Sequence, residues 1–381
     1  MGMKMEIDGK KIFERLRITS SPLKERCSKV EIESAAAAAE SGNAVPPETE
    51  ERVEKIAAEI AAARKKGASV ICAFGAHAIK NGLGRLLGAM LKKGWLSHLA
   101  SNGAAVIHDW EFSFLGKSSE DVRENAAAGR FGTWEETGLY INLALAAGAW
   151  EGLGYGAAVG AMILKNGIDI PARAELLEAA GSFFKADRSG ALSAGKAAAA
   201  LDYYGLIEAL RIPSGFLSVN HPWSSYSVLA AAGEAGRPFT CHPMFGHDII
   251  YTHRASRGAA IGRTAERDFL EYVAGVENLE GGVYLSVGSA VMSPMIFEKA
   301  LSMARNAAGG NGTIRDCGIH VVDLQESSWN WSGGEPPADN PAYYLRFMKT
   351  FNRMGCRIDY TRSDNRDFFT ALYKALEKTA D

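Results

Sequence analysis

The chain has 381 residues, of which 47% are hydrophobic and 23% charged, and its formal net charge is −2. This composition is typical of a globular protein with room for one large or two smaller α/β domains. The near-neutral charge argues against a nucleic-acid partner bound by phosphate neutralisation. No apolar run approaches the roughly 20 residues of a membrane helix, so we expect no membrane attachment.

The predicted elements begin after an irregular segment. Residues 1–45 are polar and patternless apart from an alanine run near their end, and residues 46–381 form a single α/β domain in our interpretation. Pro46, Pro47 and the glutamates that follow begin a helix that Gly67 ends, because proline and acidic side chains favour a first helical turn. Strand 68–74, helix 81–93 and strand 97–102 then form a β-α-β unit.

Residues 103–210 are predicted to be almost wholly helical and are rich in alanine, which indicates a helical layer or insertion. Beyond Pro213 strands and helices alternate again. The expected strands here are 216–219, 238–241, 282–287, 319–323 and 357–360. The expected helices here are 224–236, 264–276, 293–306, 342–354 and 364–376. Seven strands alternating with helices predict an α/β fold with a doubly wound, mainly parallel Rossmann-like sheet.

Five scattered cysteines show no C-x-x-C spacing, which excludes a zinc finger and fits structural thiols in a reducing cytoplasm. They are Cys27, Cys72, Cys241, Cys317 and Cys356. We therefore expect a cytoplasmic protein.

Small residues end the first two predicted strands, and each strand end opens into a helix. Ligands bind at the carboxyl ends of parallel strands, where glycine allows close approach and a helix N-terminus favours anions. The candidate cofactor residues here are Gly75, Ala76, His77 and Asn81 at the first turn and Ser101, Asn102 and Gly103 at the second, with His108 as a candidate catalytic residue. The motif G-x-G-x-x-G is absent, so a nucleotide site at these turns rests on topology.

Three histidines crowd into residues 242–253, after the strand 238–241. His242, His247, Asp248 and His253 could hydrogen-bond a ligand or exchange protons with it, and two further interpretations are a transition-metal site and purely structural histidines. The spacing matches no helical metal motif, so we expect no metal.

Two later strand ends are also candidates. The stretch 286–293 is predicted either to hold a phosphate on backbone N–H groups or to be a tight turn capped by Ser293. The stretch 323–339 combines Asp323 and Glu326 with two tryptophans, which suits a cationic or ring-bearing ligand, or else is an ordinary loop anchored by its aromatic side chains.

These motifs, taken together, resemble the deoxyhypusine synthase family, whose fold is an NAD-binding doubly wound sheet. Residues 74–82 are similar to the family's turn beside NAD, and residues 101–109 resemble its Thr-Thr-Ala-Gly-Gly-Val-Glu-Glu-Asp turn. The stretch 247–253 resembles Gly-Asp-Met-Ile-Phe-Phe-His, and 323–326 resembles Thr-Ala-Gln-Glu. The resemblance covers roughly 68–134 and 216–376, and implies NAD as cofactor, a small-molecule substrate and a homotetramer.

The residues that carry the family's chemistry differ. Ile107 and His108 replace its Glu-Glu pair, and Arg346 falls where the family has the lysine that forms a Schiff base. Arginine stays protonated and cannot form that imine. We therefore expect a deoxyhypusine synthase-like protein that is not a genuine deoxyhypusine synthase.

Three functions remain open at this point. The first is an NAD-dependent transferase or oxidoreductase in which His108, His247, Asp248, His253, Glu326 and Arg346 are the candidate catalytic residues and Asp323 contacts the cofactor. The second is a metal-dependent hydrolase using the 242–253 cluster. The third is a ligand-binding relative without catalytic activity.

Overall fold

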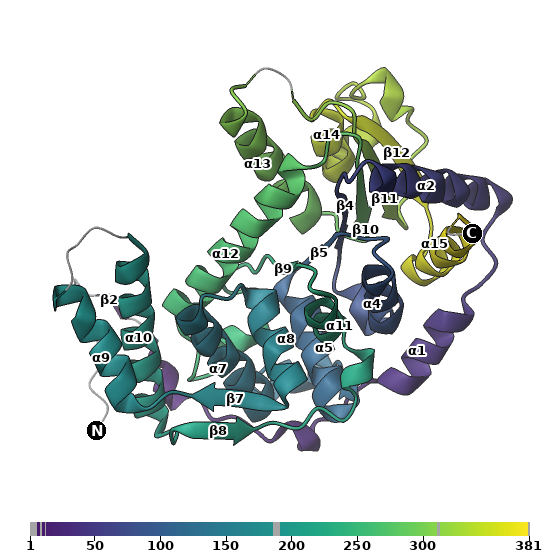
Figure 1. Cartoon of the computed structure of the whole chain (residues 1–381). Helices are drawn as coiled ribbons and strands as arrows, with labels where there is room; N and C mark the ends of the chain where they lie inside the picture. The colour runs from purple at the N-terminus through teal and green to yellow at the C-terminus, as the bar shows by residue number, and fades with distance from the viewer. Residues whose placement is uncertain (1–5, 8–9, 12, 186–190, 311–312, 380–381) are drawn as a thin grey trace.

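The computed structural model describes residues 6–7, 10–11, 13–185, 191–310 and 313–379. At its centre lies a six-stranded, wholly parallel sheet with the order β12-β11-β10-β4-β5-β9 (Figure 1). Its strands are β4 (Val70–Phe74), β5 (His98–Ser101), β9 (Phe239–Cys241), β10 (Val283–Val287), β11 (Gly318–Asp323) and β12 (Arg357–Arg362). Numbered along the chain, this order is 6-5-4-1-2-3, so the strand sequence reverses between β4 and β10. This is the Rossmann order, and it confirms the predicted doubly wound sheet.

Helices cover both faces of this sheet, which explains why its strands are apolar throughout. Every residue of β4 and of β10 is buried. Cys72 and Phe74 belong to one hydrophobic core and Ile71 and Ala73 to the other, because successive strand residues point to opposite faces.

Seven helices form the two layers. Those on the first face are α2 (Pro47–Lys65), α4 (Gly84–Lys92), α11 (Val228–Ala235) and α15 (Asn365–Thr379). Those on the second face are α12 (Gly258–Glu277), α13 (Met292–Ala307) and α14 (Arg346–Asn352). The short helix α3 (His77–Lys80) lies between β4 and α4. The predicted helix 81–93 corresponds to α4, which begins at Gly84, and the prediction did not include α3.

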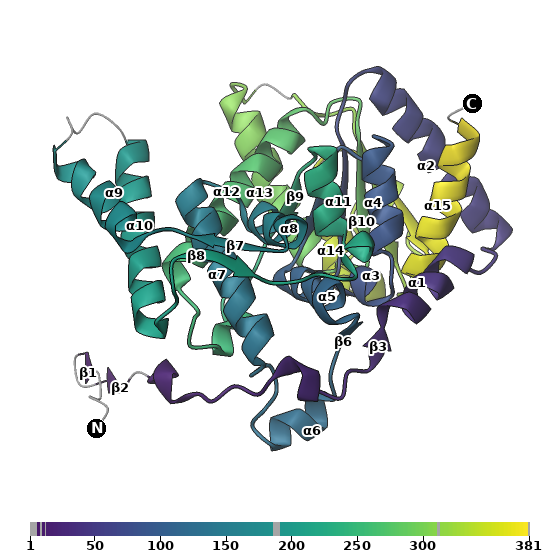
Figure 2. The same ribbon diagram turned by 60° about the horizontal axis from the view of Figure 1, so that its bottom comes forward.

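The predicted helical region is present, with α9 and α10 forming a pair that projects from the body (Figures 1 and 2). Its helices are α5 (Gly103–Leu115), α6 (Val122–Ala127), α7 (Glu135–Glu151), α8 (Tyr155–Lys165), α9 (Arg173–Lys185) and α10 (Ala191–Leu210). Two short strands, β6 (Lys117–Ser118) and β7 (Gly167–Ile170), interrupt it.

The prediction of seven strands in one sheet was wrong. The segment predicted as strand 216–219 is β8 (Gly215–Ser218), and it pairs antiparallel with β7 outside the main sheet. Phe216 is 56% exposed, whereas a strand inside a doubly wound sheet is covered on both faces. The apolar pair Phe216-Leu217 led us to predict a strand of the main sheet. The exposure of β8 fits its position outside that sheet.

The N-terminal segment is held against the helical region by a buried ion pair. Arg26 donates two hydrogen bonds, of 2.7 and 2.8 Å, to the carboxylate of Glu111 on α5, and both side chains are 1% exposed. Ser118 and Thr137 donate to the same carboxylate at 2.5 and 2.9 Å. Figure 2 shows the segment, in purple, running along the outside of the molecule. It contains α1 (Ile32–Ser41), which includes the alanine run, and β3 (Val30–Glu31), which pairs with β6.

Two of the cysteines form a disulfide, contrary to the expectation of isolated structural thiols. Cys317 and Cys356 are bonded, with their Cα atoms 5.3 Å apart. They immediately precede Gly318 and Arg357, which are register partners in β11 and β12, so the sheet places them side by side. Their separation of 39 residues hides the pairing from a search for close spacing.

Within the described part of the chain, no helix combines the length and apolar character needed to cross a membrane.

Candidate functional site

The two predicted cofactor turns come together at the carboxyl edge of the sheet. Gly75, Ala76 and His77 follow β4, and the Ser101 hydroxyl at the end of β5 donates a 2.7 Å hydrogen bond to the Phe74 carbonyl. Asn102 is the N-cap of α5, where its side-chain oxygen accepts from the Ala105 N–H at 3.1 Å. The first turn of α5 therefore begins at this edge, and the N-terminus of a helix favours a negatively charged group.

The reversal of strand order lies beside the first of these turns. The Gly75 N–H donates to the Val287 carbonyl of β10 at 3.1 Å, and a Cβ at Gly75 would lie 2.1 Å from the Gly288 oxygen. Only glycine fits this close approach. From here the chain after β4 enters α3 on one face and the chain after β10 enters α13 on the other, which is how an open α/β sheet forms a ligand crevice.

The turn after β10 differs in one detail from its prediction. Ser289, rather than Ser293, supplies the side chain that accepts a hydrogen bond at the start of α13, from the Ser293 N–H at 3.1 Å. The Ser293 side chain is buried and pairs with the Tyr284 hydroxyl at 2.9 Å. A capped turn is therefore formed, with Ser289 in the capping role.

Three other predicted residues lie away from these turns or bond elsewhere. Asn81 donates to Asn365 at the start of α15, 3.0 Å away. Asp323 ends β11, two strands from β4, and its Oδ1 accepts from the next two backbone N–H groups at 2.8 and 3.2 Å. Glu326 pairs with Arg362 at 2.6 Å, and its side chain is 80% exposed.

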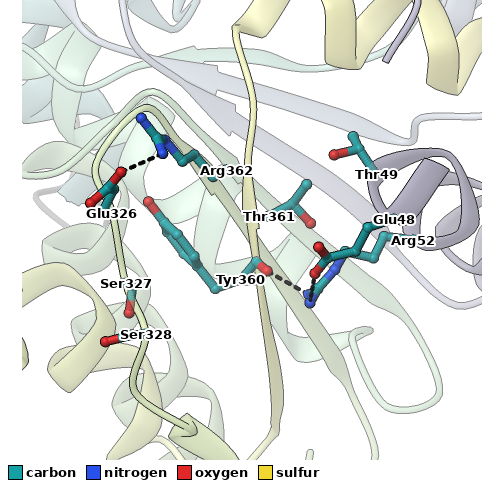
Figure 3. Close-up of a pocket in the computed structure, with 9 residues that line it drawn as sticks. All are labelled: Glu48, Thr49, Arg52, Glu326, Ser327, Ser328, Tyr360, Thr361 and Arg362. Atoms are coloured by element: carbon teal, nitrogen blue, oxygen red, sulfur yellow. Dashed lines mark hydrogen bonds and ion pairs between the residues drawn. The ribbon is translucent and has the colours of Figure 1, made fainter. Parts of the chain in front are cut away.

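Glu326 lines a cavity of about 320 Å³ at the edge strand β12, beside the N-terminal turn of α2 (Figure 3). Arg52 spans this cavity by donating to the Tyr360 carbonyl at 2.6 Å and to Glu48 at 2.9 Å. Because two strands, β11 and β10, separate β12 from β4, Glu326 does not join the two cofactor turns.

The His108 side chain is fixed by a hydrogen bond to Ser118. Its Nδ1 lies 2.7 Å from the Ser118 hydroxyl, and burial lowers the pKa of the imidazole to about 4, although the nearby Glu111 carboxylate opposes this shift. The ring is therefore neutral at physiological pH, beside the helix α3 that follows the first turn.

The histidines of residues 242–253 diverge. His253 is buried, its Nδ1 accepts from the Ala255 N–H at 3.1 Å, and its Nε2 therefore carries the proton that faces Glu135 at 3.2 Å. His247 is exposed. These bonds hold His253 against Glu135 at the start of α7.

His242 points into the second core. Its Nε2 lies 3.0 Å from the Thr240 hydroxyl, which in turn lies 3.0 Å from Nε2 of His98 on β5. Burial lowers the pKa of both imidazoles to about 3. In the part of the chain that the structure describes, no three His, Cys, Asp or Glu side chains converge to hold a metal ion.

Asp248, unlike the exposed His247 beside it, is buried, and its carboxylate lies against the start of α5. A Cβ at Gly103 would lie 2.3 Å from Asp248 Oδ2, so the carboxyl group rests on the backbone of that first helical turn. Burial raises the pKa of Asp248 to about 7, and the neighbouring Tyr251 only partly opposes this. A carboxyl group with this pKa can accept or release a proton near neutral pH.

Four buried polar atoms without a hydrogen-bond partner gather around Asp248 and the end of β9, and we call their residues the acid–phenol cluster. They are Asp248 Oδ2, Asp268 Oδ1 and the hydroxyls of Tyr155 and Tyr251. Burial also raises the pKa of Asp268 to about 7, although the N–H groups of Cys241 and Gly156 donate to its other oxygen at 2.7 and 3.0 Å. Unpaired buried polar groups are rare in folded proteins and indicate a functional role or a missing partner.

Sequence reasoning identified Asp248 and missed the other members of this cluster. Tyr251 lies within the histidine-rich stretch, but Tyr155 and Asp268 lie on α8 and α12 without any motif.

The predicted catalytic role of Arg346 cannot be related to the cluster, because the side chain of Arg346 lies outside the described residues. Lys349, one helical turn further, places its Nζ 3.6 Å from the centre of the Tyr343 ring.

No protein-family model and no curated protein matches the chain. Among solved structures, unliganded AgrE shares 14% identity and a TM-score of 0.42, covering 88% of this chain and 34% of its own. ArgZ, an arginine dihydrolase from the ornithine–ammonia cycle in cyanobacteria, shares 12% identity and a TM-score of 0.41, covering 88% and 32%. A putative LOR/SDH protein from Methanococcus maripaludis S2 shares 12% identity and a TM-score of 0.43, covering 89% and 72%.

The chain thus spans about a third of the length of AgrE and ArgZ. AgrE has also been solved in a ternary complex with ornithine and NAD⁺. The named proteins are not deoxyhypusine synthases. The doubly wound sheet that the resemblance implies is present in the structure.

Proposed function

We propose that this protein is an enzyme that binds NAD at the carboxyl edge of the sheet, beside β4, and acts on a small polar molecule. The observation that carries the proposal is the reversal of strand order between β4 and β10, because open α/β sheets bind ligands in the crevice at that point. The resemblance of residues 74–82 and 101–109 to cofactor turns of the deoxyhypusine synthase family supports the same place.

The residues at this edge fit a dinucleotide. Ala76 in the first turn and Ala104 in the first turn of α5 are small and only half-buried, so a phosphate could approach the backbone there. Ser101 keeps the ends of β4 and β5 together through its bond to the Phe74 carbonyl. NAD, when bound, supplies a hydride acceptor.

Asp248 is the proposed acid–base residue. Its Oδ2 is buried and unpaired, and its raised pKa allows it to take a proton from a substrate hydroxyl or amino group and to return it. The half-buried Tyr251, which lies beside Asp248, would hydrogen-bond the same substrate. Arg346 in place of the Schiff-base lysine supports chemistry other than deoxyhypusine synthesis.

Calorimetric titration with NAD tests the cofactor. We expect the wild-type protein to bind, and we expect Ala76→Glu to abolish binding because it places a carboxylate where phosphate would lie. Ala62→Glu, at an exposed position on α2, is the matched control and should bind normally. Absence of both heat and thermal stabilisation at millimolar NAD with the wild-type protein would refute the proposal.

A homotetramer, which the family resemblance implies, is part of the same proposal. Light scattering should then give a mass about four times the 40.8 kDa of the chain. A monomer mass would contradict it.

A further inference from the structure

We propose that a second site, at the amino ends of β4, β5 and β9, binds a phosphate-bearing small molecule. A cavity of about 750 Å³ opens there, at the opposite end of the sheet from the cofactor turns. Four basic side chains, Arg64, Lys92, Lys93 and Arg237, line it. A hollow of this size is ordinary for a small-molecule site.

Two of these side chains, Arg64 and Arg237, supply the positive charge of the cavity. Nη2 of Arg64 and Nη2 of Arg237 lie 3.8 and 4.0 Å from the position that a Cβ on Gly94 would take, so both guanidinium groups lie beside Gly94. Arg64 also donates to the Lys93 carbonyl at 3.3 Å. Among the described residues, neither guanidinium forms an ion pair with a carboxylate.

Two guanidinium groups that converge without a counter-charge repel each other, and an anion between them removes this repulsion. Each guanidinium can donate two parallel hydrogen bonds to phosphate oxygens, a geometry that a lysine ammonium cannot reproduce. The arrangement is therefore better matched to a multiply charged phosphate group than to a single chloride ion.

The remaining charges at the cavity do not cancel this positive field. Lys92 and Lys93 each pair with a carboxylate, Glu234 at 2.6 Å and Glu377 at 2.8 Å, so they are locally neutralised. Glu271 is the one acid among the described lining residues. Its single carboxylate does not balance the two arginines that lack an ion-pair partner.

Polar groups complete the floor of the cavity. Ser69 and His98 are buried there, and Asn278 lies on the rim. The His98 ring bonds to Thr240 through Nε2. These groups offer hydrogen bonds to the non-phosphate part of a ligand.

Calorimetry with inorganic pyrophosphate tests this site in protein saturated with NAD, which occupies the carboxyl edge. We expect one equivalent to bind the wild-type protein. The Arg64→Gln/Arg237→Gln double variant should bind at least about tenfold more weakly, because two charge-assisted contacts are lost. Arg123→Gln/Arg130→Gln, which removes two exposed arginines elsewhere and keeps the same net charge, should bind like the wild type.

The Ala76→Glu protein separates this site from the proposed function. It should lose NAD binding and keep pyrophosphate binding. Unchanged affinity in the Arg64/Arg237 double variant, or no heat with the wild-type protein, would overturn the second site whatever the NAD result. Equal affinity for citrate would overturn its assignment to phosphate.

Discussion

Replacing Arg26 by methionine should destabilise the protein in a strongly pH-dependent way. The arginine is the only cation paired with Glu111 among the described residues, and both side chains are 1% exposed. Burial by itself raises the pKa of Glu111, but the charge and hydrogen bonds of Arg26 outweigh it and hold that pKa below its usual value. Methionine keeps much of the volume and removes the charge.

The size of the effect follows from what Glu111 does without its partner. Its carboxyl would have to become protonated in the folded state, which at pH 7 costs about 1.4 kcal/mol for each pH unit above the ordinary glutamate pKa of about 4.3, or about 4 kcal/mol. This agrees with the roughly 3–5 kcal/mol measured when one partner of a buried pair is removed. At pH 5 the same reasoning leaves a cost of about 1 kcal/mol.

Urea unfolding of Arg26→Met and of the wild type at pH 7 and pH 5 measures this difference. The direction is fixed because a depressed carboxylate pKa stabilises the fold above the unfolded-state pKa and loses that effect as the pH falls. Arg26→Met/Glu111→Gln should recover most of the loss at pH 7. Lys29→Met, which breaks the exposed Lys29–Asp121 pair, is the control and should cost at most about 1 kcal/mol. A loss in Arg26→Met that is equal at both pH values would refute the reasoning.

Three further predictions concern stability. Asp248→Asn should raise the melting temperature at pH 8 and have almost no effect at pH 4. The carboxyl group has a pKa raised to about 7 in the folded protein, so it opposes folding once the pH exceeds its pKa in the unfolded chain. An unchanged melting temperature at pH 8 would contradict this. Gly75→Ala should cost about 1–3 kcal/mol in urea unfolding, since its Cβ would lie 2.1 Å from a carbonyl oxygen, whereas Gly262→Ala, in open space on α12, should gain about 0.5–1 kcal/mol. Cys317→Ser/Cys356→Ser should lose about 4 kcal/mol by the chain-entropy model for a 39-residue separation, and a reductant should lower the wild-type melting temperature but not that of the variant.

The sheet was predictable because its strands are buried on both faces and therefore form continuous apolar runs. Residues 70–74 and 283–287 show this pattern and were placed within one or two residues of β4 and β10. The exposed strand β8 carries a similar apolar pair, so local composition alone could not place it outside the sheet. The disulfide depends on the register of β11 and β12, which is a property of the folded sheet.

The candidate site was predictable in part for a related reason. Small residues at strand ends mark the carboxyl edge of a parallel sheet, and so Gly75, Ser101 and Gly103 were found. The acid–phenol cluster draws Tyr155 and Asp268 from helices more than 100 residues apart in sequence. A buried aspartate on a helix has no sequence signal of its own, and its partners become visible only when the helices pack.

The Thr240 hydroxyl between His98 and His242 restricts which ring nitrogens carry protons. A hydroxyl has one hydrogen, so at most one of the two neutral rings can present an unprotonated Nε2 to it. If a ligand at the amino-end cavity fixes the proton of His98 on Nδ1, Thr240 must donate to His98, and His242 must carry its proton on Nε2. A ligand that sets the tautomer of His98 on β5 would thus also fix the proton of His242, which follows the neighbouring strand β9.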